Sequence, residues 1–143
     1  MTVRPAVILA RLQHLGQVLV QLDRLRALSP PERVDPLLCL AAERALHVAI
    51  EAVLDVGHHV LAGRGHPIPP AYRGVVPALV VHGILEVDLG TRLEGMAGMR
   101  NILVHDYMHV DAAQIWNAVD ERVDDLRDVH LAFAALAELE RGR

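Results

Sequence analysis

The sequence has no lysine, a single cysteine and few aromatic residues. All 14 basic residues of this 143-residue chain are arginine, and Phe, Trp and Tyr together make up 3% of it. The single cysteine, Cys39, excludes a disulfide framework within the chain and is typical of a reducing compartment. Because aromatics are scarce, the core must consist of Leu, Val, Ile and Ala, which favours packed helices over a β-sandwich.

An excess of basic charge and long apolar runs are also missing. The formal net charge is −4, whereas a general nucleic-acid binder is usually basic, because phosphate contacts supply much of its affinity. If the protein handles RNA, a local cluster of cations must do so. Arg11 interrupts the apolar run near the N-terminus and no later run is long enough for a membrane span. We therefore expect no signal peptide, no membrane partner and a cytoplasmic protein.

The spacing of apolar residues predicts an all-α fold. Leu, Ile and Val recur at steps of three and four, the period of a helix with one buried face. Five helical segments are predicted, at roughly 5–28, 36–62, 71–83, 86–105 and 111–141. Pro77 predicts a kink or a late start in the third segment, and Asp111 is a suitable N-cap for the fifth. Short connections favour an up-and-down antiparallel bundle, with residues 1–143 as a single domain.

The second segment carries one row of polar residues on an otherwise apolar helix. The row consists of Glu43, His47, Glu51, Asp55 and His59, each four residues after the one before. Residues four apart lie on the same side of a helix. We interpret this row, called the acidic row below, as a solvated face or as the lining of a groove.

The fourth segment places an arginine where a core residue belongs. Leu93, Met96, Arg100 and Leu103 follow one another at steps of three and four. A buried guanidinium without a partner is very unfavourable, so Arg100 requires an anion. One possibility is an internal ion pair with the acidic row. The other is a phosphate in a cleft, which the planar and permanently charged guanidinium suits well.

A histidine follows Arg100 closely. Arg100 and His105 are five residues apart, which separates them by about 140° on an ideal helix. They can share a face only if the helix ends or is distorted, whereas Asn101 and His105 share one already. The sequence after His105 indicates a helix end. A break there would let Arg100, Asn101, His105 and Tyr107 converge on one pocket.

This set of residues suits the cleavage of RNA without a metal. The ribose 2′-hydroxyl is itself the nucleophile, so no reactive serine or cysteine is needed. A histidine can act as general base or acid near neutral pH, and an arginine can stabilise the charge that develops on the phosphate. The motif has one histidine per chain, whereas the reaction needs both a general base and a general acid. A symmetric dimer would bring two copies together.

The string from Arg100 to Tyr107, RNILVHDY, resembles the R-x4-H-x-Y motif of HepT-like toxins in the HEPN superfamily. The helical layout and the stretch from Glu43 to Asp55 extend the resemblance over nearly the whole chain. The resemblance implies a dimeric or larger, metal-independent endoribonuclease toxin without a cofactor. It also implies that Arg100 and His105 are the catalytic pair and that Asn101 supports them. Tyr107 would be the tyrosine that an MntA-type nucleotidyltransferase antitoxin modifies with AMP.

Two other functions remain open from the sequence. The first is a non-catalytic HEPN module that only binds a nucleotidyltransferase, although such a module would not need all four motif residues. The second is a metal-dependent bundle hydrolase. His105 and His109 have the spacing of metal ligands on a helix. A third ligand could come from the second segment, from His47, Glu51, Asp55 or His58. No paired Glu-x-x-His motif is present, so we expect no metal.

Overall fold

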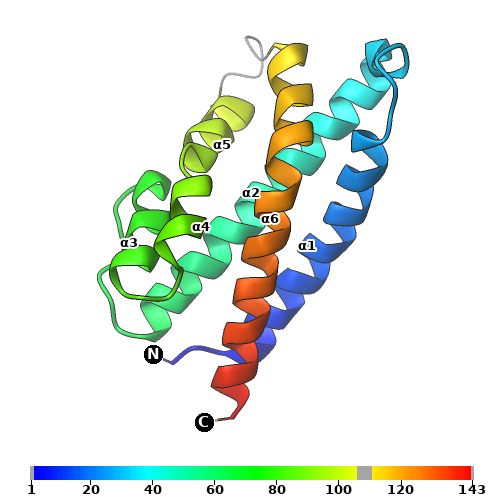
Figure 1. The fold of residues 1–143 in the computed structure, drawn as a ribbon. Coiled ribbons are helices and arrows are strands. Elements are labelled where there is room, and N and C mark those ends of the chain that lie inside the picture. Colours follow the sequence, from blue (N-terminus) through cyan, green and yellow to red (C-terminus); the bar gives the residue numbers. More distant parts are fainter. Residues whose placement is uncertain (1, 106–110, 143) are drawn as a thin grey trace.

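The computed structural model describes residues 2–105 and 111–142, and of His105 only its place in a helix. Its four longest helices are α1 (Pro5–Arg26), α2 (Pro36–Gly63), α5 (Met96–His105) and α6 (Ala112–Arg141). They run alternately up and down the molecule (Figure 1). This arrangement confirms the predicted all-α, up-and-down bundle.

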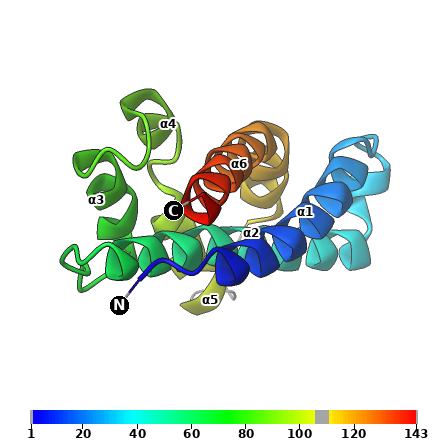
Figure 2. The same ribbon diagram turned by 90° about the horizontal axis from the view of Figure 1, so that it is seen from below.

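The shorter elements lie at one side and one end of the bundle. They are the 3-10 turns η1 (Glu32–Val34) and η2 (Tyr72–Gly74) and the helices α3 (Val75–Val81) and α4 (Val87–Arg92). Seen along the bundle, α1, α2 and α6 pack against one another, while α3 and α4 stand together beside them (Figure 2). The late start predicted for the third segment is confirmed: Pro77 lies in the first turn of α3, where its missing N–H is not needed.

The core forms where the apolar spacing predicted it. Ile8, Leu12 and Leu15 of α1 are buried, as are Leu54 of α2 and Phe133 of α6. Asp111 is the N-cap of α6, as predicted, and its carboxylate accepts a hydrogen bond from the backbone N–H of Ala113 at 3.0 Å. Within the two described ranges, no helix is long and apolar enough to cross a membrane.

The predicted segment 86–105 is two helices, not one. α4 ends at Arg92 and α5 begins at Met96. Between them Gly95 has a φ of +84°, a left-handed conformation that glycine adopts without steric strain. The apolar row predicted across this segment survives the break, since Leu89, Leu93 and Met96 are all buried. The turn at Gly95 therefore re-aims α5 without removing it from the core.

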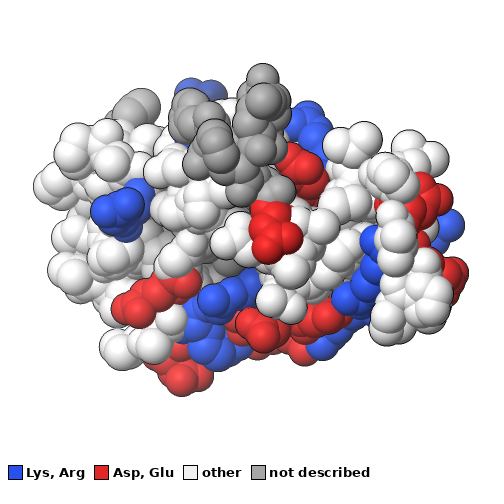
Figure 3. Space-filling view, turned by 90° about the horizontal axis from the view of Figure 1, so that it is seen from above, with Lys and Arg blue, Asp and Glu red and all other residues white. Residues whose placement is uncertain are grey.

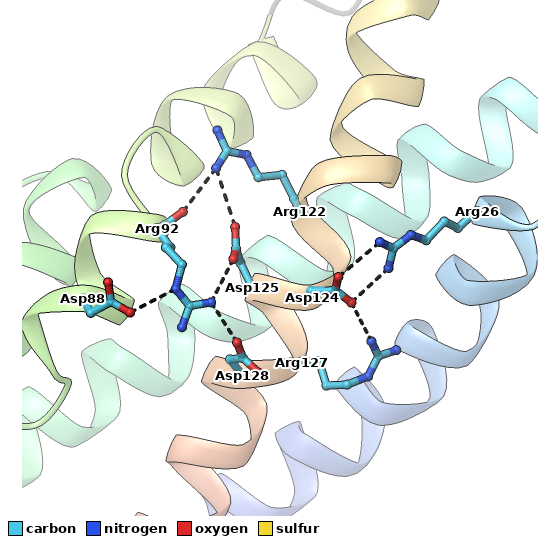
Figure 4. A network of polar contacts seen from close by, with 8 residues as sticks. All are labelled: Arg26, Asp88, Arg92, Arg122, Asp124, Asp125, Arg127 and Asp128. Carbon is cyan, nitrogen blue, oxygen red and sulfur yellow. Dashed lines mark hydrogen bonds and ion pairs between the residues drawn. The ribbon is translucent and has the colours of Figure 1, made fainter.

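A row of aspartates on α6 forms ion pairs with arginines of three other elements. Asp120, Asp124, Asp125 and Asp128 make up this row, called the aspartate row below. Arg33 of η1 meets Asp120 at 2.7 Å, and Arg26 at the end of α1 meets Asp124 at 2.9 Å. Arg92 of α4 bridges Asp125 and Asp128 at 3.0 and 2.7 Å (Figure 4). The row thereby ties α1, η1 and α4 to the last helix.

Candidate active site

Arg100 projects from α5 toward α2 and meets Glu51 of the acidic row. Its Nε and one terminal nitrogen both lie 2.9 Å from the same carboxylate oxygen of Glu51. The Arg100 side chain is only 15% exposed. Of the two anions that the sequence left open for Arg100, the structure shows the internal one. Charge-assisted contacts of this length hold a side chain firmly in place.

Two further residues complete the surroundings of the Arg100 guanidinium. The guanidinium carbon lies 4.3 Å from the ring centre of Tyr72 in η2, a cation–π contact. One terminal nitrogen also donates to the Asn101 side-chain oxygen at 3.3 Å. The guanidinium has more N–H groups than these contacts use. The remaining ones sit on its two terminal nitrogens, and in the part of the chain that the structure describes they have no partner. That outer edge can bind an anion.

The acidic row continues from Glu51 along α2 in both directions. His47 lies 3.4 Å from Glu51 on one side, and Arg44 in turn contacts His47 at 3.2 Å. On the other side, Asp55 pairs with Arg11 of α1 at 3.3 Å. His47, Glu51 and Asp55 line a groove of about 460 Å³ between α1 and α2. The row therefore lines a groove, one of the two placements predicted from the sequence.

Two groups of the acidic row have altered acidity. Burial raises the pKa of Asp55; the Arg11 guanidinium opposes this rise and the Glu51 carboxylate adds to it. Burial lowers the pKa of His59, and the positive charge of Arg4 lowers it further. The His59 ring accepts a hydrogen bond from the backbone N–H of Arg4 at 3.0 Å, which requires a neutral ring nitrogen. His59 therefore anchors the start of α1.

The backbone of α5 fixes the angle between Arg100 and His105 about the helix axis. α5 is a continuous α-helix from Met96 to His105, without the distortion between the two residues that would bring them to one face. Their positions therefore stand about 140° apart around the helix axis. Asn101 is exposed and lies on the side of α5 that faces α6. The helix end expected after His105, as well as Tyr107 and His109, lies outside the described residues.

Glu51 and Tyr72 are the site residues that the sequence did not single out. Glu51 stood in the acidic row, but periodicity could not tell which of its carboxylates meets Arg100. Tyr72 begins the 3-10 turn η2 shortly after two prolines, and no spacing rule connects it to α5. Among the described residues, no group of three or more His, Cys, Asp or Glu is placed to hold a metal ion.

Comparison with known proteins gives consistent matches. Residues 9–132 match the model of a family described as ribonuclease HepT-like. A tRNA nuclease HepT from Aphanizomenon flos-aquae is 26% identical over 122 residues, which cover 82% of this chain and 80% of that protein.

Two solved structures have a similar fold. The cytosolic protein YutE from Bacillus subtilis has a TM-score of 0.86 at 22% identity, over 99% of this chain and 95% of that one. A tri-AMPylated HEPN toxin from Shewanella oneidensis, in complex with MNT antitoxin, has a TM-score of 0.81 at 20% identity, over 90% of this chain and 97% of that one. At these identities, the structural likeness establishes a shared fold.

Proposed function

Because this chain belongs to the ribonuclease HepT-like family, we propose that it is the toxin of a toxin–antitoxin pair and cleaves RNA through Arg100 and His105. The family assignment confirms the resemblance drawn from the RNILVHDY motif and the prediction of a ribonuclease. The surroundings of Arg100 support the assignment of this activity to individual residues. Glu51 and Tyr72 fix its guanidinium on two sides and leave an outer edge of N–H groups for an anion.

In the proposed reaction, the ribose 2′-oxygen attacks the adjacent phosphorus and the bond from phosphorus to the 5′-oxygen breaks. The products are a 2′,3′-cyclic phosphate and a free 5′-hydroxyl. His105 takes the proton from the 2′-hydroxyl or gives one to the leaving oxygen. The outer edge of Arg100 binds the phosphate oxygens, where negative charge builds up in the transition state. Asn101 supports this step by holding one terminal nitrogen of Arg100.

We also propose that the active unit is a homodimer. Arg100 and His105 occupy positions on different sides of α5, and one histidine cannot serve as base and acid at once. A two-fold axis beside the C-terminal end of α5 would place two copies of the pair in one cleft, because each contact across such an interface occurs twice. One copy of His105 can then remove a proton while the other supplies one.

The proposed regulation is the addition of AMP to Tyr107 by a nucleotidyltransferase antitoxin. Two observations support it. Tyr107 stands two residues after His105 in the motif, and the structurally similar toxin from Shewanella oneidensis is AMPylated and bound to MNT antitoxin. AMP on Tyr107 would bring a phosphate and a bulky nucleotide to the place where RNA binds, and it would offer Arg100 a competing anion.

Cleavage of total RNA in the presence of EDTA tests the reaction. We expect His105→Ala to lose about 10²- to 10⁴-fold in rate, the usual contribution of a general acid or base. His82→Ala, which removes an exposed histidine at the end of α3, should cleave like the wild type. The wild-type products should end in a 2′,3′-cyclic phosphate. Cleavage that stops in EDTA and returns with zinc would instead establish the metal-dependent hydrolase.

Intact mass measurement tests the regulation. The chain is incubated with ATP, magnesium and a nucleotidyltransferase encoded beside it. We expect a mass increase of one or more AMP units on Tyr107 together with loss of RNA cleavage, and Tyr107→Phe should resist both changes. Inhibition of the wild type without a change in mass would show that the antitoxin acts by binding alone.

A further inference from the structure

A second groove, of about 670 Å³, lies on the other side of α5 from Glu51. It is bounded by η2, α5 and α6. The residues that line it include Arg73, Gly98, Asn101, Gln114, Asn117 and Arg122. The groove therefore begins at a motif residue, Asn101, and extends away from it between two helices. Among the described residues, its polar lining is mostly amides and guanidinium groups, and Glu121 is the one acidic residue.

Arg73 is the unusual member of this lining. Most arginines that the structure describes form an ion pair with a carboxylate, as Arg26, Arg33 and Arg92 do. Arg73 is exposed and has neither an ion pair nor a hydrogen bond within residues 2–105 and 111–142. Arg73 directly follows Tyr72 in η2. The Tyr72 ring contacts the Arg100 guanidinium, and the Arg73 side chain lines the groove. An arginine without a carboxylate is available to a phosphate.

Two side-chain amides of α6 that line the groove also lack a hydrogen-bond partner among the described residues. Gln114 and Asn117 are exposed, lie three residues apart on one side of the helix, and have no side-chain hydrogen bond to any described residue. A carboxamide both donates and accepts, so it can bind the edge of a base or a ribose hydroxyl. Together with Asn101 they line the groove with groups that suit a nucleic acid strand better than an apolar protein surface.

Gly98 leaves open space beside these polar groups. It lies within α5, where glycine is one of the poorest helix formers. A Cβ on Gly57 would collide with Val75, and a Cβ on Gly90 would collide with Val80, so packing requires both of those glycines. A Cβ on Gly98 would have no atom within 4 Å. Packing within the described chain therefore does not explain this glycine, whereas close approach of a ligand would.

We propose that this groove binds the RNA strand that adjoins the cleaved bond. Arg73 contacts a backbone phosphate, the amides of Gln114 and Asn117 contact ribose or base edges, and Gly98 lets the strand approach α5. The inference rests on the proposed function and extends it. It also accounts for how a chain of net charge −4 binds RNA, since the cation that does so is local and is not neutralised by a carboxylate.

The test measures binding of a short, fluorescently labelled RNA that carries 2′-O-methyl groups and so cannot be cleaved. Arg73→Gln should weaken binding about 3- to 10-fold and lower the slope of log affinity against log salt by about 0.7, the value for one phosphate contact on a single strand. Gly98→Leu should weaken binding by filling the groove, and Gly98→Ala keeps the test valid if leucine impairs folding. Arg24→Gln is the matched control, because Arg24 also lacks a carboxylate partner among the described residues but lies on α1.

The outcomes separate this inference from the proposed function. If the wild type cleaves RNA and both Arg73→Gln and Gly98→Leu bind and cleave equally well, the groove proposal is wrong and the proposed function stands. If the wild type neither binds nor cleaves RNA, both are wrong. If a Gly98 variant changes the oligomeric mass, or only its inhibition by the antitoxin, the groove is a protein contact and the RNA proposal is overturned.

Discussion

The arginines of this protein occupy two contrasting settings. Along α6, the aspartate row neutralises Arg26, Arg33 and Arg92, and each of these guanidinium groups meets two carboxylate oxygens of the row. At α5 and η2, Arg100 meets only one carboxylate oxygen, that of Glu51, and Arg73 has no carboxylate among the described residues. The first setting uses the guanidinium to join helices, and the second leaves part of it free to bind an anion.

This difference explains how an acidic protein can have an RNA site. Figure 3 shows acidic and basic side chains interleaved along one edge of the molecule and a largely uncharged surface over much of the same face. Neighbouring charges of opposite sign offset one another, and salt screens exposed charges that lie more than a Debye length apart, roughly 8 Å at physiological salt. The net charge of the chain therefore says little about the local potential at Arg100 and Arg73.

A large effect on catalysis that would sharpen this comparison is expected at Glu51. Glu51→Gln removes the charge that fixes Arg100 and keeps the shape of the side chain. We expect kcat to fall about 10- to 100-fold with little change in KM, because a misplaced Arg100 stabilises the transition state poorly. Glu51→Asp should recover part of the loss.

Glu43→Gln is the matched control for Glu51, since Glu43 lies two turns earlier in the acidic row. It should leave kcat unchanged. An unchanged kcat in Glu51→Gln would show that Arg100 needs no partner on α2, and the contrast between the two settings would lose its basis.

A smaller effect, on stability alone, is expected at Arg33. Its side chain is 16% exposed, pairs with Asp120 and lies 4.8 Å from the ring centre of Trp116. Arg33→Met keeps the apolar stem and should lower the free energy of unfolding by about 1 kcal/mol, as measured by urea denaturation. RNA cleavage should not change. A loss of cleavage in folded Arg33→Met would show that the aspartate row also serves the site.

The smallest effect is the pH dependence of that same pair. The hydrogen bonds from Arg33 lower the pKa of Asp120 below its usual value. The stabilisation is therefore complete above the unfolded-state pKa, about 4, and is lost as the pH falls from there through the folded-state pKa. The difference in unfolding free energy between the wild type and Asp120→Asn should shrink below about pH 4. A constant difference down to acid pH would mean that the pair contributes no charge-dependent stability.

Much of the fold could be predicted from the sequence, because apolar periodicity reports directly which helix face is buried. Leu12 and Leu15 illustrate this on α1. The break at Gly95 could not be predicted, because the apolar row continues across it and a lone glycine does not specify a left-handed turn. At the site, spacing showed that Arg100 needs an anion, but only the packing of α5 against α2 and η2 selects Glu51 and adds Tyr72.

The most direct test of the account measures RNA cleavage and thermal stability for Arg100→Gln and Arg92→Gln side by side. Both variants remove a guanidinium from an ion pair and keep a polar side chain. Arg100→Gln should lose about 10²- to 10³-fold in kcat, comparable to removing one transition-state donor elsewhere, while the protein stays folded at the assay temperature. Arg92→Gln should keep its cleavage rate and lower the Tm by about 2–4 °C for each kcal/mol lost. Full cleavage by Arg100→Gln, or loss of cleavage in folded Arg92→Gln, would contradict the account.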